Sequence, residues 1–377
     1  MNKKEVSEIK HNFTEDNGFM TISKILTTFI DAENEVKYNE VHSFLPMTAE
    51  AREVYITTLK NVLSTSVGKK FTEYKFEDDA YGETGIQSIL YNLIQTEFGD
   101  TDVIDSYVNH IKENIEYTGP YNVITSYCIY SVPHKSSTGD LEDYDNEQIF
   151  KFILTAICPA DTSKDGFIYD KEHEEVVKKV NNELIISMKP TDGFMFPTFS
   201  DRMADVNSVM IYTKSTKDVN VSICTDFLNC TYRIGAETEK TVFDAVLTNI
   251  LSDDLNYNVI NHINESIKQT ISQNSNDTEI PTITSYDLKH VLRETGVDDT
   301  KLDRIESVWN SICGVPELTA SNLITPVHKL NAEGVSVTVK GNYADKVHTS
   351  TMNGRKCIVI DVDEPVIEIN GMSVKLQ

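Results

Sequence analysis

The stretch that decides the fold class reads YNVITSYCIYSV and covers Tyr121–Val132. It is rich in β-branched and aromatic residues in rough alternation, which is typical of a β-strand. Similar apolar runs follow at Phe150–Cys158, Leu184–Met188 and Val209–Tyr212. Short runs of this kind, separated by turn residues, predict a central mixed or antiparallel sheet of about four to six strands.

The residues before this stretch have helical spacing instead. Apolar residues three and four positions apart predict helices within residues 1–65, including one over Thr21–Phe29, and two more within residues 84–118. These segments are expected to pack on the sheet, so the predicted fold class is α+β.

The residues after the sheet return to helix and then to strand. Apolar residues every three or four positions predict a long amphipathic helix within 241–273, and a helical pair follows at 285–313. Between them, Ser272–Pro281 reads SQNSNDTEIP, a polar sequence typical of a linker. Short apolar strands then run from Val335 to Leu376, and Asn370–Gly371 between two of them predicts a β-hairpin.

These patterns divide the chain of 377 residues into four predicted parts. The N-terminal helical region covers residues 1–118, and the α/β core sheet covers residues 119–240. A helical connector, with its linker near residues 272–281, covers residues 241–320. A small C-terminal β unit covers residues 321–377.

The chain is strongly acidic, with 59 acidic against 34 basic side chains and a net charge of −25. Such a charge repels polyanions, so general nucleic-acid binding is disfavoured. The N-terminus has no apolar stretch typical of a signal peptide, and no run is long enough to span a membrane. The six cysteines show no CxxC pairing and are expected to be buried thiols. The cytoplasm is therefore the predicted compartment, and no membrane partner is expected.

The best candidate for a functional segment is Gly193–Lys214, which reads GFMFPTFSDRMADVNSVMIYTK. It combines aromatic surface, a proline turn and paired charge, which are the components of a ligand or partner site. The candidate binding residues are Phe196, Phe199, Asp201, Arg202 and Asp205.

Two other interpretations of this segment stay open. The phenylalanines can instead fill the core beside Pro197 while Arg202 pairs with an acid and holds the loop. Alternatively, Asp192, Asp201 and Asp205 can hold a catalytic metal, as in a nuclease. The sequence contains no complete phosphate-loop, nucleophile-elbow or HExxH motif. No cofactor or metal is therefore predicted, and the acidic loop Ser136–Glu147 is expected to be a solvated surface loop.

The chain resembles an uncharacterised bacterial family, catalogued as domain of unknown function 4317. The resemblance rests on five segments and extends over almost the full length. They are MNKKEVSEIK at the start, Ile157-Cys158-Pro159, the Ser163-Lys164-x-Gly166 turn, the segment Gly193–Lys214, and NGRKCIVIDVDEP near the end. The family implies no established activity.

A second likeness, in the order of elements alone, is to the 37-kilodalton nucleoid-associated proteins. Their α/β core, helices and small terminal β unit follow in the same order, but no motif matches residue by residue. Likeness in fold is weak evidence about function, so no residue roles are carried over.

The leading hypothesis is a non-enzymatic cytoplasmic binding or interaction protein with a protein partner. The first alternative is a nucleoid-associated DNA-binding protein, and the second is a metal-dependent hydrolase or nuclease that uses Asp201 and Asp205. The sequence does not predict an oligomeric state.

Overall fold

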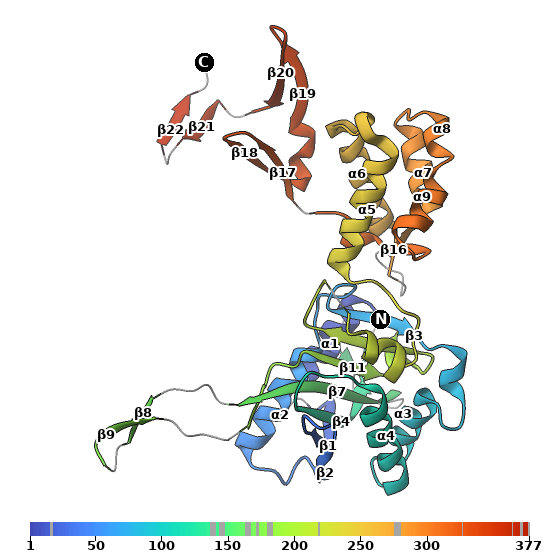
Figure 1. Ribbon diagram of the computed structural model, residues 1–377, viewed down its shortest axis with the longest axis vertical. Helices are drawn as coiled ribbons and strands as arrows, with labels where there is room; N and C mark the ends of the chain where they lie inside the picture. Colours follow the sequence, from blue (N-terminus) through green and yellow to red (C-terminus); the bar gives the residue numbers. More distant parts are fainter. Residues whose placement is uncertain are drawn as a thin grey trace. The chain divides into compact units, whose positions relative to one another are not determined.

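The computed structural model describes residues 1–15, 18–135, 141–142, 148–162, 167–170, 173–178, 184–217, 219–274, 280–325, 327–363, 365–369 and 372–375. The chain forms two compact units (Figure 1). Unit 1 consists of Met1–Ala236 with Asp277–Ile280, and unit 2 consists of Glu237–Asn276 with Pro281–Gln377.

Unit 1 is built on an antiparallel sheet, which confirms the predicted α+β class, but the described strands of this sheet number eight rather than the four to six predicted. The strand order is β2-β1-β4-β7-β11-β14-β3, and β10 pairs with β7. The strands are β1 Met20–Ile30, β2 Val36–Ser43, β3 Phe71–Lys75, β4 Tyr121–Val132, β7 Gln148–Thr162, β10 Leu184–Ile186, β11 Asp192–Phe196 and β14 Ser208–Thr213.

The prediction of a helix over Thr21–Phe29 is wrong, because these residues belong to strand β1. The pairing of β1 with β4 shifts register between Ile22 and Lys24. This bulge leaves Ile22 and Ile25 in the same core cluster although they are three positions apart. A bulged strand thereby imitates helical spacing. Within residues 1–118, β1, β2 and β3 join the same sheet as β4 and β7.

Helices cover both faces of the sheet (Figure 1). On one face lie α1 Lys3–Asn12 and α2 Ala49–Val62. On the other face lie α3 Ile86–Gln95, α4 Thr101–Asn114 and the π-helical turn η2 Ser222–Phe227. The predicted helices within residues 84–118 are therefore confirmed, as is the packing of N-terminal helices on the sheet.

Strand β4 shows how the two faces are filled. Val123 and Tyr127 point into the cluster under α3 and α4, whereas Ile124 and Cys128 point into the cluster under α1 and α2. Successive side chains of a strand alternate between faces, so a strand buried on both sides has few polar positions. This explains why β-branched, aromatic and other apolar residues make up most of YNVITSYCIYSV on both faces.

The described part of unit 1 also contains three smaller strand pairs and one 3-10 helix. They are β5 His134–Lys135 with β6 Leu141–Glu142, β8 Phe167–Asp170 with β9 Glu175–Lys178, β12 Thr198–Ser200 with β13 Met203–Asp205, and the 3-10 helix η1 Asp78–Tyr81. Most of the acidic loop 136–147, and the Ser163-Lys164-x-Gly166 turn, lie outside the described residues.

Unit 2 begins with helices. The predicted long helix within 241–273 is divided by the 3-10 turn η3 Ser252–Asp254, and Asn256 caps the second half by accepting hydrogen bonds from the backbone of Asn258 and Val259. The elements are α5 Ala236–Leu251, α6 Tyr257–Gln273, β15 Thr282–Thr284, α7 Ser285–Glu294, α8 Asp299–Leu302, α9 Ile305–Ile312, β16 Glu317–Thr319 and α10 Ala320–Leu323. The middle of the predicted linker, residues 275–279, is not among the described residues.

The C-terminal part of unit 2 is β, as predicted, and its strands form a series of β-hairpins. They pair β17 Val327–Ala332 with β18 Val335–Lys340, β19 Val347–Met352 with β20 Arg355–Ile360, and β21 Val366–Ile369 with β22 Met372–Lys375. The 3-10 segment η4 Gly341–Lys346 joins the first two hairpins. The Asn370–Gly371 turn is not described, but Ile369 and Met372 on its two sides are paired. Across the described parts of the chain, no helix has the length and apolar character to cross a membrane.

Candidate functional site

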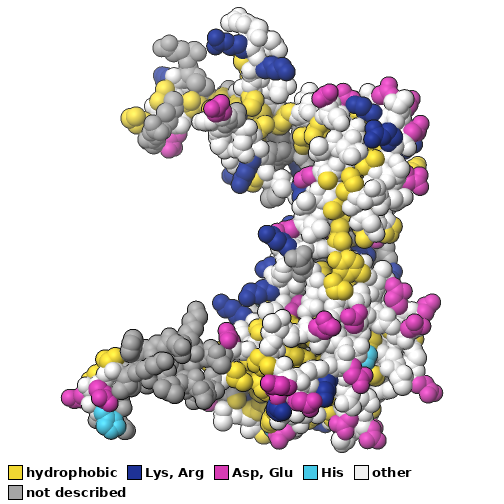
Figure 2. Space-filling view, in the orientation of Figure 1, with side chains coloured by type: hydrophobic (Ala, Val, Ile, Leu, Met, Phe, Trp, Pro, Cys, Tyr) yellow, Lys and Arg dark blue, Asp and Glu magenta, His cyan; other side chains and the backbone are white. Residues whose placement is uncertain are grey.

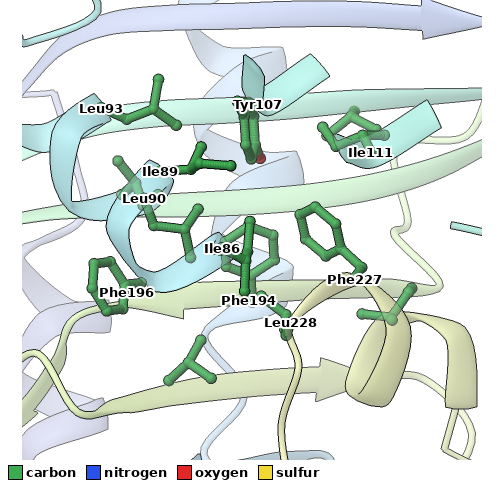
Figure 3. Close-up of a cluster of buried hydrophobic side chains, with 14 of the residues drawn as sticks. Ile86, Ile89, Leu90, Leu93, Tyr107, Ile111, Phe194, Phe196, Phe227 and Leu228 are labelled. Carbon is green, nitrogen blue, oxygen red and sulfur yellow. The ribbon is translucent and has the colours of Figure 1, made fainter. Parts of the chain in front are cut away.

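The three phenylalanines of the Gly193–Lys214 segment lie in the core. Phe194 and Phe196 of β11 point into the cluster formed with α3, α4 and η2 (Figure 3). Phe199 lies in the opposite cluster, where its ring centroid is 4.8 Å from that of Phe150. All three side chains are fully buried. Their burial favours the packing interpretation over an exposed aromatic surface.

Asp201 and Arg202 form the turn of a tight hairpin between β12 and β13. Ser200 pairs with Met203, so the loop has two residues, and both have positive φ, 49° and 62°. Two-residue hairpin loops require this conformation because it matches the twist of the flanking strands. The Phe196–Pro197 peptide bond just before this hairpin is cis.

The turn directs Arg202 toward helix α1. Its Nη1 donates to Oε1 and Oε2 of Glu8 at 2.9 and 2.7 Å, and its Nη2 donates to the Pro133 carbonyl at 2.8 Å. Tyr130 donates to the same Glu8 carboxylate at 2.8 Å. Both charged side chains are largely buried. Arg202 therefore connects α1, the end of β4 and the hairpin, as the structural interpretation predicts.

The acidic residues proposed for a metal site do not form one. Asp192 is buried at the start of β11. Asp201 is an exposed residue of the turn between β12 and β13. Asp205 accepts a hydrogen bond from the backbone of Asn207. Among the residues that the structure describes, no group of three His, Cys, Asp or Glu side chains has the arrangement to hold a metal ion.

Asp192 is instead the centre of a buried polar cluster. The Tyr117 hydroxyl donates to its Oδ2 and lies 2.5 Å from Oγ1 of Thr191. Thr213 and Asn220 also hydrogen-bond its carboxyl group. Burial raises the pKa of Asp192 above 3.8, and these hydrogen bonds act in the opposite direction. The cluster connects β11 and β14 with the chain segments next to α4 and η2.

The pKa of Asp192 predicts how stability varies with pH. A carboxyl group whose pKa is raised by folding stabilises the fold fully below its ordinary value of about 4, and this contribution is lost as pH rises toward the raised value. In that window, the free energy of unfolding should fall by up to about 1.4 kcal/mol per pH unit. Because Asn does not titrate, Asp192→Asn should remove this slope. Urea denaturation in half-unit steps from pH 4 to 7 measures it.

Glu53→Gln provides the control for this measurement, because Glu53 is an exposed carboxylate on helix α2. This variant should keep the wild-type slope. If the unfolding free energy of wild type and of Asp192→Asn fell equally with pH, the pH dependence could not be assigned to Asp192.

A surface groove lies beside the turn between β13 and β14, which is part of the Gly193–Lys214 segment. Its volume is about 690 Å3, and its lining residues are Tyr81, Glu83, Gln87, Ser88, Tyr91, Asn92 and Val206. Two hydrogen bonds fix its walls, from Gln87 Nε2 to the Val206 carbonyl at 3.0 Å and from Ser88 Oγ to the Tyr81 carbonyl at 3.2 Å. The groove thus joins η1 and α3 to the turn between β13 and β14.

Gly85 allows the close approach of η1 and α3 that shapes this groove. A Cβ atom at Gly85 would lie 2.3 Å from the Ala80 carbonyl oxygen. The approach leaves Tyr81 and Tyr91 40% and 42% exposed at the groove. These are large aromatic surfaces in a site that is otherwise lined by amide, hydroxyl and carboxylate groups and by Val206.

The groove is also acidic. Burial raises the pKa of Tyr81, and the nearby carboxylates of Asp205 and Asp78 raise it further. The Tyr81 hydroxyl donates to Asn207 Oδ1 at 3.4 Å. Among the residues that line the groove, Glu83 carries the carboxylate, whereas Asp78 and Asp205 lie outside this lining and act on it through Tyr81.

Sequence reasoning found only one edge of this groove. Of the five candidate residues, only Asp205 lies near the groove. Its carboxylate is close enough to Tyr81 to raise the pKa of that tyrosine. Tyr91 carried a usable signal that was missed. It is an aromatic residue on the outward face of α3, whose residues Ile86, Leu90 and Leu93 point into the core (Figure 3).

Comparison with known proteins identifies the family of the chain. No curated protein matches it. The model of one family, described as Domain of unknown function (DUF4317), matches residues 1–372. This range includes all of unit 1, unit 2 as far as residue 372, and every segment on which the resemblance rests. The chain therefore belongs to the DUF4317 family.

Proposed function

We propose that the protein is a non-enzymatic binding protein that holds a basic segment of another protein in the groove between Tyr81 and Tyr91. The observation that carries the proposal is the pair of half-exposed tyrosines in an acidic groove of about 690 Å3. Tyrosine supplies a large contact area at low entropic cost, and it is enriched at protein interfaces.

The charges of the groove select the chemistry of the partner. Glu83 lines the groove, and the carboxylates of Asp78 and Asp205 lie close enough to Tyr81 to raise its pKa. A lysine or arginine side chain can pair with these carboxylates and stack on a tyrosine ring. The net charge of −25 attracts a basic partner at long range as well. Figure 2 shows acidic side chains spread over the visible face of unit 1.

The proposal includes the cytoplasm as the compartment. Its support is that all six cysteines are free thiols and that five of them are buried. Free thiols are typical of a reducing environment.

Peptide binding tests the proposal. The probes are two fluorescently labelled ten-residue peptides, one with lysine and arginine spaced by aliphatic residues and one with glutamate at the basic positions. Fluorescence anisotropy should detect binding of the basic peptide alone, and the affinity should fall with added salt. Tyr91→Ala should weaken binding at least about 10-fold, because it removes one of the two aromatic walls.

Tyr286→Ala is the matched control, since Tyr286 is a 76% exposed tyrosine on α7 in unit 2. It should bind like the wild type. Binding of neither peptide, or an equal loss in both variants, would contradict the proposal. A gel shift of plasmid DNA that Tyr91→Ala does not change would instead favour the nucleic-acid alternative.

A further inference from the structure

Each C-terminal hairpin has exposed apolar side chains. In the hairpin of β19 and β20, Val347 pairs with Ile360 and Thr349 pairs with Ile358, so these residues share one face. Figure 2 shows hydrophobic side chains at the surface of this region. The exposed fractions range from 37% to 64% for Val335, Ile358, Ile360, Val366, Met372 and Val374.

The hairpins also have free strand edges. Within the described part of the chain, each of β17 to β22 pairs with one other strand, so every hairpin is a two-stranded sheet. A two-stranded sheet is marginally stable in water, and three or more strands with an apolar face are needed for independent stability. An apolar strand with a free edge is a template for pairing with another chain.

The C-terminal β unit has no net charge, in contrast to the rest of the chain. Residues 321–377 contain six basic and six acidic side chains, so the whole net charge of −25 belongs to residues 1–320. Two copies of this chain repel each other over their acidic surfaces but not over this part. A contact between copies is therefore favoured here.

We propose that strand β20 pairs antiparallel with β20 of a second copy. An isologous contact about a two-fold axis places each residue opposite a fixed partner. With Ile358 on the axis, Arg355 of one copy lies opposite Asp361 of the other, and this pair occurs twice. Within Arg355–Asp361, RKCIVID, the two end charges are thus complementary and Cys357 lies opposite Val359, while Lys356 lies opposite Ile360.

The pairing hydrogen-bonds the free edge of β20 and brings the exposed apolar side chains of the hairpin together. The strands β19 and β20 of two copies form one four-stranded antiparallel sheet, and the inner edges of both β20 strands become hydrogen-bonded. Ile358 and Ile360 from both copies then lie together on one face of this sheet. The occupant is accordingly a second copy, and no other protein is required.

Charge reversal in the full chain tests this pairing. Light scattering after size exclusion, over a range of concentrations, should give twice the chain mass of 42.6 kDa for the wild type. Arg355→Asp and Asp361→Arg should each raise the dimer Kd at least about 10-fold, because each change creates two like-charge contacts. The double variant should restore the affinity, since the reversed charges pair again.

Arg293→Asp is the control, because it makes the same charge change at an exposed position on α7. It should leave the dimer unchanged. A wild-type mass of one chain at every concentration would overturn the proposal. So would an Arg293→Asp effect equal to that of Arg355→Asp, or a double variant no tighter than the single variants.

Cross-linking tests the register without disturbing the charges. Ile358→Cys, in a Cys357→Ser background, places the same thiol in both copies at the two-fold axis. Mild oxidation should convert most of this variant to a covalent dimer on a non-reducing gel. Thr338→Cys, an exposed position on the polar face of β18, should stay monomeric. Equal cross-linking of the two variants would exclude the proposed register.

Discussion

Gly193→Ala is expected to lower the free energy of unfolding by about 3 kcal/mol or more. A Cβ atom at this position would lie 2.4 Å from the backbone oxygen of Thr155 and 2.9 Å from Val62 Cγ2. Thr155 belongs to β7, which is paired on its two sides with β4 and β11. The backbone oxygen therefore has little freedom to move away. Urea denaturation followed by far-ultraviolet circular dichroism measures the loss.

Gly82→Ala is the matched control for this experiment. A Cβ atom at Gly82 has its nearest neighbour, the Asp79 carbonyl oxygen, at 3.9 Å. The same substitution in open space should change stability by less than about 1 kcal/mol, because only the unfolded chain is affected. Similar losses for the two variants would contradict a steric origin.

Phe199→Ala is expected to cost about 3–5 kcal/mol of unfolding free energy. The ring is fully buried on the α1–α2 face of the sheet, 4.8 Å from the Phe150 ring and 6.0 Å from the Tyr130 ring, measured between centroids. Removing it leaves a cavity in a core whose other members are held by the sheet. The denaturation midpoint at constant slope measures the effect.

Met203→Ala is the control for this prediction. It shows whether truncating any side chain of this hairpin lowers stability, or only truncating a buried one. Met203 lies on the neighbouring strand β13 and is 57% exposed. Its truncation should cost less than about 0.5 kcal/mol. A comparable cost at Met203, or a loss below about 1 kcal/mol at Phe199, would show that Phe199 does not act through burial.

The Gly193–Lys214 segment joins several elements of unit 1. Gly193 lets β11 pack against α2, Phe199 fills the core, and Arg202 joins the hairpin to Glu8 of α1. Each of these contacts joins residues far apart in the chain. Most of the contacts of this segment are therefore packing or ion-pair contacts within unit 1, and it reaches the proposed binding groove through the β13–β14 turn at Val206.

The sequence by itself determined the elements whose signal is local. Helices α3 and α4 follow from apolar residues spaced by three and four, and strands β18, β20, β21 and β22 follow from short β-branched runs separated by turn residues. The α+β class and the central sheet follow from the same patterns. Periodicity depends only on neighbouring residues, so it can be read without knowing the partners.

Only the tertiary structure decided which residues meet. Strand β1 imitates a helix because a bulge, imposed by its pairing with β4, changes its period. Arg202 became a structural residue because Glu8 accepts its hydrogen bonds across 194 positions of sequence. The groove joins Tyr81 and Tyr91 to Val206. A burial or charge pattern indicates that a side chain needs a partner, but the partner is chosen by the chain's path in space.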